Sequence, residues 1–447
     1  MLFSVKKTPN MRPGELWGRW LETAARRPRA ALLVDAGRGC TYRAAEITAA
    51  AEAVFQAGNF DRAGGCVAWV LPNGLDWLAL FLAVQKAGWA AMPLDAGLTE
   101  TQGRELARRL GATHLWTGQA LSPLGTRARR WPGIAVVKTT SGSSGQAAAV
   151  PCRARHLLAD YENIRAGMGL RLHDRNLGLI PWGHSYGLGS VVMPLLVDGL
   201  PIITAAAYTI SQIPEWCERY HPTVFPSVPA VFQLLAENSG SRPLGQLRLA
   251  ISAGAPLSPA IAHAFRRRSG LRLHNFYGAS ETGGICYDRT GRAVFTDSCV
   301  GSPLPGVRVT FRVGRVLVQS AAVAAKNGRH LLPDGGAWNE KGELLLRGRI
   351  GRWANLAGRK VAPVEIESQL RSLPGVTEVW CGVGVRAGRD FLAVAVESGK
   401  GESELKRALA ERLPAWKQPR AWLVLAQFPR TARGKTDSRA LSSRLGL

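Results

Sequence analysis

The stretch KTTSGSSGQAAAVP, Lys138 to Pro151, is the part of this chain that says most about its fold. It places a loop of serine, threonine and glycine between a predicted strand and a predicted helix. Backbone amides and hydroxyls in such a loop can wrap phosphate groups. Glycine and serine also make ordinary loops, so the stretch alone is a weak signal. No lysine or arginine follows before Arg153, which leaves the source of positive charge for a bound phosphate open.

The loop is not a Walker phosphate loop. The only GKT in the chain runs from Gly434 to Thr436, and the residue five positions before Gly434 is Pro429 rather than glycine. No predicted strand, loop and helix surround it, as that motif requires. The sequence therefore excludes a P-loop nucleotide hydrolase.

Helical periodicity alternates with short apolar runs on both sides of the loop. A helical pattern begins near residue 40, and later strands are LRLAISAGAPL and LRLHNFYG. The first half predicts strands at 66–71, 90–95 and 113–117 with helices between them, the first at 74–89. Strands separated by helices of this length predict parallel sheets with helices on both faces. We therefore expect an α/β fold with a large N-terminal domain of parallel or mixed sheets flanked by helices.

The pattern changes near LLLRGRIGRW, residues 344–353. Beyond it the sequence predicts a compact α+β unit with a basic tail. Its expected elements are a helix at 365–373, strands at 378–385 and 390–398, a helix at 402–413 and a strand at 421–428.

Composition narrows the class of protein. At 447 residues with 46% hydrophobic content, the chain has room for two or three domains and a large core. A formal net charge of +25 and a pI near 10.7 suit nucleic acid, an anionic membrane or an acidic protein partner. The arginine clusters carry no interleaved aromatics and no zinc-binding spacing, which favours a solvated surface over a nucleic-acid face. An acidic carrier protein or a polyanionic small molecule stays compatible.

The seven cysteines are odd in number and never form a CxxC pair, which suits a reducing cytoplasm rather than a disulfide framework or a zinc site. The start of the chain has no apolar core of signal-peptide type. The apolar runs are too interrupted to span a bilayer. We expect a soluble, cytoplasmic protein.

Further motifs follow the loop in a fixed order: PWGHSYG, PSVPAV, SAGAPLS, NFYGASETGG, GSPLPGV, PDGGAWNEKGELLLRGR, AGRKVAPVEIE and FPRTARGKTDSRAL. Together they resemble the acyl-adenylate-forming superfamily of acyl- and aryl-CoA synthetases, peptide-synthetase adenylation domains and luciferases. The resemblance covers essentially the whole chain, including LPNGLDWLALFLAVQKAGWAAMPLD near its start. It implies an N-terminal adenylation domain at 1–350 and a small, mobile α+β domain at 351–447.

The resemblance implies a set of ATP-binding residues. The phosphate loop matches at Ser141, Gly142, Ser143, Ser144 and Gly145. The turn that contacts adenine matches at Gly254, Ala255 and Pro256. The strand end where an aromatic packs on adenine matches at Asn275, Tyr277 and Gly278. Asp334 matches the aspartate that holds both ribose hydroxyls, and Arg349 matches the neighbouring ribose-contacting arginine.

Attack of a carboxylate on the α-phosphate of ATP brings two anions together, so a fixed cation and a divalent metal should supply most of the acceleration. The resemblance makes Lys435 the catalytic lysine and Glu281 the Mg²⁺ ligand, and Ser280 takes the place of a phosphate-binding threonine. The structural alternatives are a solvated tail lysine, a helix cap and, for Asp334, a turn aspartate. Motif context favours the functional role over the structural one at Lys435, Glu281 and Asp334.

The motif PWGHSYG matches a wall of the acyl pocket, at His184, Ser185 and Gly187. A core histidine is an equally good reading of His184. An α-amino acid substrate would require a carboxylate in this motif, which has none, so we expect an aryl or fatty carboxylic acid.

The acceptor is expected to be a pantetheine thiol. The segment LAGRKVAP matches the lining of the family's pantetheine tunnel, at Gly358, Arg359 and Lys360. Coenzyme A and a phosphopantetheinyl carrier protein both fit, and the basic surface favours an acidic carrier.

The chain departs from the family pattern at three places. Proline, lysine and glycine of the phosphate loop are replaced by Ala147, Ala148 and Ala149. Leu332 and Pro333 replace a threonine and a glycine before the ribose aspartate, and Gly351 and Asn355 replace the hinge residue and a following lysine.

Charge at the loop is then expected from Mg²⁺ on Glu281, from Lys435, or from Arg153 or Arg155. Loss of the loop lysine should weaken ATP binding more than it abolishes chemistry. A second reading is a non-catalytic descendant that binds an acyl-nucleotide or a carrier protein. A third is nucleic-acid binding through the arginine surface, and nothing in the sequence supports a luciferase-like oxygenase.

Overall fold

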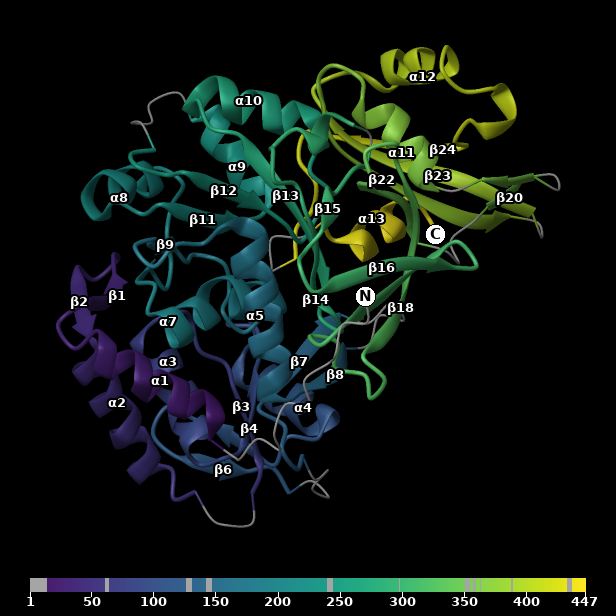
Figure 1. The fold of residues 1–447 in the computed structure, drawn as a ribbon. Coiled ribbons are helices and arrows are strands. Elements are labelled where there is room, and N and C mark those ends of the chain that lie inside the picture. The colour runs from purple at the N-terminus through teal and green to yellow at the C-terminus, as the bar shows by residue number, and fades with distance from the viewer. Residues whose placement is uncertain are drawn as a thin grey trace, which may run out of the picture.

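The computed structural model describes residues 14–60, 64–125, 131–141, 147–238, 244–296, 298–349, 354–356, 359–361, 363–386, 389–431 and 436–447. Two large sheets, covered by helices, form the N-terminal part of the chain (Figure 1). A smaller unit built from the end of the chain lies against one side, next to α10 and β19.

The first large sheet has nine strands in the order β15-β14-β13-β12-β11-β9-β10-β1-β2. Its central strands, from β13 to β1, run parallel, and antiparallel strands close both ends. The bounds are β1 Ala31–Asp35, β2 Cys40–Arg43, β9 Asn176–Leu177, β10 Ile202–Thr204, β11 Val224–Ser227, β12 Leu249–Ser252, β13 Leu273–Ala279, β14 Gly283–Tyr287 and β15 Ser302–Pro303. The parallel strands are apolar along their length because helices cover both faces.

The second sheet has six strands in the order β6-β5-β3-β4-β7-β8. Strands β5, β3, β4 and β7 are parallel, and β6 and β8 pair antiparallel at the edges. The bounds are β3 Cys66–Trp69, β4 Ala90–Pro93, β5 His114–Trp116, β6 Leu121–Pro123, β7 Val136–Ser141 and β8 Ala147–Cys152. The strands predicted at 66–71, 90–95 and 113–117 are β3, β4 and β5, which confirms the α/β fold class.

Helices fill the space between and outside these sheets. The helix predicted at 74–89 is α3, whose side chains are buried along almost its whole length. It contributes Trp77 and Phe81, whose stacked rings lie 5.3 Å apart, and Trp182 meets Trp77 edge to face at 5.5 Å. The helices of this part are α1 Glu15–Arg26, α2 Ala44–Ala57, α3 Leu75–Lys86, α4 Glu100–Leu110, α5 Ala154–Met168, α6 Ser185–Gly187, the π-helix η1 Leu188–Val192, α7 Met193–Asp198, α8 Gln212–Tyr220, α9 Pro229–Glu237, α10 Pro259–Ser269 and the 3₁₀ turn η2 Ala293–Phe295.

The prediction of a helix directly after the serine and glycine loop was wrong. Residues 147–152 form β8, an antiparallel partner of β7, and α5 begins only at Ala154. Pro151 explains the difference, because proline in a helix interior removes a hydrogen bond and clashes with the preceding turn. The loop therefore joins two strands of a hairpin.

A four-stranded antiparallel sheet follows the nine-stranded one, in the order β16-β17-β18-β19. Its strands are β16 Val307–Arg312, β17 Arg315–Ser320, β18 Arg329–Trp338 and β19 Leu344–Arg349. Alternating burial along β17 is typical of a sheet with one face in a core and the other toward water. No strand of this sheet was among those predicted from the sequence.

The end of the chain folds as expected for a small α+β unit. Strands β22, β23 and β24 form a three-stranded sheet, and β20 pairs with β21. The bounds are β20 Ala354–Leu356, β21 Arg359–Val361, α11 Pro363–Arg371, β22 Val376–Arg386, β23 Arg389–Ser398, α12 Glu402–Ala410, the 3₁₀ turn η3 Ala415–Lys417, β24 Ala421–Leu425 and α13 Ser438–Arg444. The exact boundary between residues 350 and 351, and the mobility of this unit, stay predictions.

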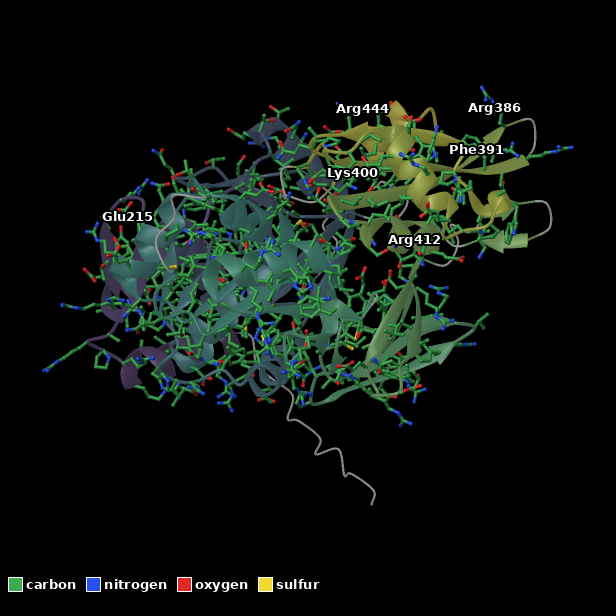
Figure 2. The ribbon with its side chains drawn as sticks, turned by 90° about the horizontal axis from the view of Figure 1, so that it is seen from above. Glu215, Arg386, Phe391, Lys400, Arg412 and Arg444 are labelled. Carbon is green, nitrogen blue, oxygen red and sulfur yellow. The ribbon has the colours of Figure 1, made fainter. Side chains whose placement is uncertain are left out.

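Basic side chains decorate the small unit. Figure 2 shows Arg386, Lys400, Arg412 and Arg444 on this unit, and Glu215 of α8 at the opposite end of the molecule. All seven cysteines lie within the described residues and are free thiols. Among the described residues, no helix is long and apolar enough to cross a membrane.

Asp174, completely buried, ties three parallel strands together at their amino ends. It precedes β9 and accepts hydrogen bonds from the side chain of Thr223 (2.7 Å), just before β11, and from Nε of Arg248 (2.8 Å), just before β12. The backbone N–H of Arg171 also donates to it, at 2.7 Å. Burial raises the pKa of Asp174, but the hydrogen bond from Arg248 and those from Arg171 and Thr223 lower it more, so its pKa lies below the ordinary value.

Replacement of Asp174 by asparagine is expected to lower the free energy of unfolding by about 3 kcal/mol at pH 7, because it leaves Arg248 without its buried counter-charge. Since folding lowers the pKa of Asp174, its stabilising contribution is complete above the ordinary value of about 3.9 and is lost as the pH falls through the folded-state pKa. Denaturant unfolding at several pH values should show the difference from wild type shrinking below about pH 4.

The matched control is Asp76→Asn, at an exposed position in the first turn of α3. It should change stability by less than about 1 kcal/mol at either pH. If the free energies of unfolding of wild type and Asp174→Asn differed by the same amount down to pH 3, the role of the ionised carboxylate would be contradicted.

Candidate functional site

The side chains expected to hold a nucleotide sugar meet where β13 faces the four-stranded sheet. The Tyr277 hydroxyl of β13 donates to Oδ2 of Asp334 at 2.8 Å. Asp334 lies in β18, and its backbone pairs with that of Arg349 in β19. The side chains of Tyr277 and Asp334 are therefore brought together, with the backbone of Arg349 beside Asp334, and their roles in binding a nucleotide stay predictions.

The remaining predicted adenine-contacting residues lie at the carboxyl ends of neighbouring parallel strands. Gly254, with φ +84°, follows β12 and leads into Ala255 and Pro256 in the loop before α10. Asn275 of β13 is buried and donates to the carbonyl of Cys299 at 3.1 Å. In open α/β sheets ligands bind outside the carboxyl ends of the strands, which is where this group lies.

Gly278 is needed for close backbone packing. It lies opposite Gly284 in the hairpin of β13 and β14. A Cβ atom at Gly278 would come within 2.6 Å of the carbonyl oxygen of Gly283. The motif glycine thus allows β14 to approach, and it stays a prediction as a nucleotide contact.

Ser280 and Glu281 form the turn between β13 and β14. Glu281 is half-buried, and its charge reaches the buried Cys152 thiol of β8. Burial is the main reason that the pKa of Cys152 is raised, with Asp160 and Glu281 adding to it and Lys138 opposing it. Glu281 therefore lies within electrostatic reach of the base of the β7–β8 hairpin, where Cys152 pairs with Val136, at the end away from Ser141 and Ala147.

The donor set around Glu281 fits magnesium rather than zinc. Within the described residues, no group of three or more histidine, cysteine, aspartate or glutamate side chains could hold a metal ion. Mg²⁺ is usually held by one or two carboxylates together with substrate phosphates and water, and not by an all-protein cage. A lone, half-buried carboxylate such as Glu281 meets that requirement.

The phosphate loop itself is only partly described. Ser141 is the last residue of β7, and its backbone pairs with Ala147. Gly142, Ser143, Ser144 and Gly145 lie outside the described residues. Of the arginines considered as charge sources, Arg153 extends toward Gly133, and Nε of Arg155 donates to Nε2 of His156 at 3.3 Å.

The acyl-pocket motif forms the start of α6. Nε2 of His184 lies 3.6 Å from Oδ2 of Asp95, at the end of β4. Ser185 accepts a hydrogen bond from Nζ of Lys138 at 3.0 Å. Gly187 is buried, and a Cβ atom there would lie 2.1 Å from the carbonyl oxygen of Pro181, so its absence of a side chain is a packing requirement.

Asn73 holds this motif in place. Its Nδ2 donates to the carbonyl of Ile180 at 2.9 Å, and its Oδ1 accepts from the N–H of Trp182 at 3.0 Å. The same amide group also reaches the carbonyl of Gly178, at 3.3 Å. One side chain before α3 therefore satisfies the backbone of the segment that leads to His184.

Sequence reasoning missed Asn73, Asp95 and Lys138. An asparagine between proline and glycine is typical of a turn, so nothing in the sequence indicated a long-range contact. Two signals were present for the others. Asp95 follows a predicted parallel strand, at the end where sites form, and Lys138 interrupts an apolar strand in which lysine is rarely buried.

The segment around Lys435 is anchored to the small sheet. Lys435 itself, with Gly358, lies outside the described residues, and Arg359 and Lys360 are described as backbone of β21. Next to Lys435, the Thr436 hydroxyl donates to Glu378, and the backbone of Thr436 bridges to that of Arg430. Arg430 pairs with Glu378 at 2.6 Å and with the buried Glu397 at 3.1 Å.

Comparison with known families matches nearly the whole chain. Residues 20–131 and 126–350 match the family described as AMP-binding enzyme. Residues 365–435 match the family described as AMP-binding enzyme C-terminal domain.

Individual relatives are distant. An oxalate–CoA ligase of Arabidopsis thaliana is 23% identical over an alignment that covers 85% of this chain and 88% of that protein. An L-proline–[L-prolyl-carrier protein] ligase of Streptomyces coelicolor is 28% identical over 53% of this chain and 52% of its own length. The crystal structure of ATP-bound MatB from Rhodopseudomonas palustris superimposes with a TM-score of 0.83 at 20% identity, covering 97% of this chain and 99% of that one, which shows a shared fold.

Replacement of Asn73 by alanine is expected to lower the free energy of unfolding by about 2–4 kcal/mol, because it strips partners from more than one buried backbone group. Thermal and denaturant unfolding measure this loss. The control is Asn327→Ala, whose side chain accepts one hydrogen bond, from the N–H of Arg329, in an exposed turn. Asn327→Ala should change stability by less than about 0.5 kcal/mol. Equal losses in Asn73→Ala and Asn327→Ala would contradict the role of Asn73 in holding the segment before His184.

Proposed function

The chain belongs to the AMP-binding enzyme family, which confirms the resemblance to the acyl-adenylate-forming superfamily, and we propose that it is an ATP-dependent acid–thiol ligase for an aryl or fatty carboxylic acid. The acid would be activated as an acyl-AMP with release of pyrophosphate, and a pantetheine thiol would then take the acyl group as a thioester while AMP leaves. The observation that supports this most directly is the hydrogen bond between Tyr277 and Asp334, at the predicted adenosine site.

The proposed adenosine site combines an aromatic face with a carboxylate. The hydrogen bond from its hydroxyl to Asp334 fixes the orientation of the Tyr277 ring. Adenine would stack on one face of that ring. The second carboxylate oxygen of Asp334 can accept from ribose hydroxyls, and hydrogen bonds to an ionised carboxylate are among the strong ones. Arg349, opposite Asp334 in the sheet, would complete the sugar contacts.

The proposed phosphate contacts come from Ser141 to Gly145 of the loop, assisted by Ser280. Glu281 would hold Mg²⁺ together with phosphate oxygens, the role that the resemblance implies for it. When bound, Mg²⁺ supplies charge neutralisation for the polyphosphate. Neither role depends on the lysine that Ala148 replaces.

In the first reaction an oxygen of the acid's carboxylate bonds to the α-phosphorus, and the bond from that phosphorus to the bridging oxygen breaks. Pyrophosphate leaves with the electron pair. Lys435 would place a fixed ammonium at the charge that develops there. Arg430 supports this role by holding the neighbouring Thr436 segment against the sheet through two ion pairs.

The acid is chosen by the walls of the pocket near α6. The segment 181–187 offers no carboxylate for an ammonium group, and the ring of its Tyr186 packs against that of Phe276 with centroids 5.7 Å apart. The named relatives act on acids as different as oxalate and proline, so they do not select the acid. Apolar walls favour an aryl or fatty chain.

Coenzyme A or an acidic carrier protein would be the acceptor, with Gly358, Arg359 and Lys360 along the pantetheine path. The formal charge of +25 and the basic side chains of the small unit favour an acidic carrier (Figure 2). Free cysteines suit a reducing, cytoplasmic compartment. No role in binding nucleic acid is proposed.

Tyr277→Phe is expected to weaken ATP binding about tenfold, because Asp334 loses a charged hydrogen bond that orients it while the ring remains. Calorimetric titration with ATP measures the change. The control is Tyr161→Phe, in which another tyrosine loses a hydrogen bond to an aspartate, Asp198, at 2.6 Å and away from β13. Tyr161→Phe should lose stability but keep its ATP affinity, and equal ATP affinity in all three proteins would count against the adenosine site.

Pyrophosphate release from ATP and Mg²⁺, with a panel of aryl and fatty acids, tests the function as a whole. Release should depend on the acid and fall about 100-fold or more in Lys435→Ala, because a fixed charge at the transition state is lost. Lys406→Ala, which removes an exposed lysine of α12, should match wild type. A folded wild type that binds ATP and releases no pyrophosphate with any acid would favour the non-catalytic reading.

A further inference from the structure

Lys138 is a buried lysine in the strand that leads into the phosphate loop. Its side chain is 4% exposed, and Nζ donates to Oγ of Ser185 at 3.0 Å. Within the described part of the chain, no carboxylate comes within ion-pairing distance of Nζ. A buried ammonium whose hydrogen-bond partner is a neutral hydroxyl is costly, which indicates that an anion binds there during function.

The register of the hairpin places Lys138 on the same face as Ala148. In the pairing of β7 with β8, Thr140 lies opposite Ala148 and Lys138 lies opposite Val150. Directly opposed residues and residues two apart on a strand share one face, so Lys138 and Ala148 lie on the same face. Diagonal neighbours of this kind are about 7–8 Å apart, which a lysine stem can bridge. The family's loop lysine would stand at Ala148.

Lys138 lies between a buried carboxylate, Asp160, and the hydroxyl of Ser185. Asp160 of α5 is buried and close enough for the ammonium of Lys138 to lower its pKa, although burial raises that pKa overall. The carboxylate is already engaged, because its Oδ1 accepts from the N–H of Gly284 at 2.8 Å. Asp160 therefore offsets part of the charge of Lys138 and leaves Nζ directed at Ser185, in the acyl-pocket motif.

Neighbouring groups keep the local potential positive. Burial, and then the charges of Arg155, Arg153 and Lys138, lower the pKa of His156 to about 4. The ring is therefore neutral at pH 7 and adds no charge of its own to that of Arg153, Arg155 and Lys138. An oxyanion would be attracted to this position.

We propose that Lys138 is the cation that the phosphate loop lacks, and that its ammonium binds an oxyanion where the α-phosphate of the nucleotide meets the carboxylate of the acid. Ser185 fixes this location, since it belongs to the acyl-pocket motif and contacts Nζ directly. Lys138 then contacts the reacting atoms and is a catalytic residue. The inference rests on the proposed function, because it needs a nucleotide at the loop.

The test compares AMP, which carries the α-phosphate, with adenosine, which does not. Calorimetric titration should show Lys138→Met binding AMP about 10- to 100-fold more weakly than wild type and binding adenosine equally well. Lys138→Arg keeps the charge and should keep most of the preference for AMP. Equal AMP affinity in wild type and Lys138→Met would overturn the inference, whereas a wild type that binds neither ligand would overturn the proposed function instead.

A purely structural role for Lys138 makes a different prediction. If Lys138 only balances Asp160, then Lys138→Met combined with Asp160→Asn should recover both the melting temperature and AMP binding. Our proposal expects this double variant to recover the melting temperature and to stay weak for AMP. If Lys138→Met alone fails to fold, AMP binding can be measured in the double variant instead.

Equivalence of positions 138 and 148 is tested by adding a cation back. Ala148→Lys in the Lys138→Met background returns a charge to the same face of the hairpin. It should recover AMP affinity and acid-dependent pyrophosphate release together. Lack of recovery would contradict the claim that Lys138 supplies the charge that is missing at position 148.

Discussion

One buried carboxylate sets the geometry on which the candidate site depends. Asp174 lies two positions before β9 and ties β9, β11 and β12 together at their amino ends, through hydrogen bonds to Thr223 and Arg248, which directly precede β11 and β12. Because the strands are parallel, alignment at one end fixes the alignment at the other. The other end carries Gly254 after β12 and, one strand along, Asn275 and Tyr277 of β13. The structural carboxylate and the proposed nucleotide site therefore occupy opposite edges of one rigid sheet.

The proposed site draws its groups from elements that are anchored independently. Tyr277 belongs to the nine-stranded sheet and Asp334 to the four-stranded sheet, so their hydrogen bond depends on how these two sheets meet. Lys435 belongs to the small unit, where Arg430 fixes the adjacent segment on Glu378 and Glu397. Ion pairs with a buried partner hold a segment more firmly than exposed pairs do. Any movement of the small unit would carry Arg430 and Thr436, the described residues on either side of Lys435, together with the sheet.

The sequence predicted much of the fold because its parallel strands are short apolar runs between helices, a pattern that local physics determines. It also predicted the grouping of Tyr277, Asp334 and Arg349, through ordered motifs. It did not predict that residues 147–152 extend β7 into a hairpin, since three alanines favour a helix and only Pro151 argued against one. The role of Asn73 was not predicted because its hydrogen-bond partners lie more than a hundred positions away in the sequence. Side-chain contacts of that range leave no local sequence pattern.

A cation on an exposed loop and a cation beneath the loop bind the same anion at different cost. A loop lysine loses up to about 2 kcal/mol of rotamer entropy when it binds, and water screens its charge. Lys138 has already lost that freedom on folding, and the lower effective dielectric of its surroundings strengthens its attraction to an anion. The cost moves to the folded state, where a desolvated ammonium is only partly offset by Asp160. The chain thus exchanges stability for preorganisation, a trade that enzymes make where charge develops in the transition state.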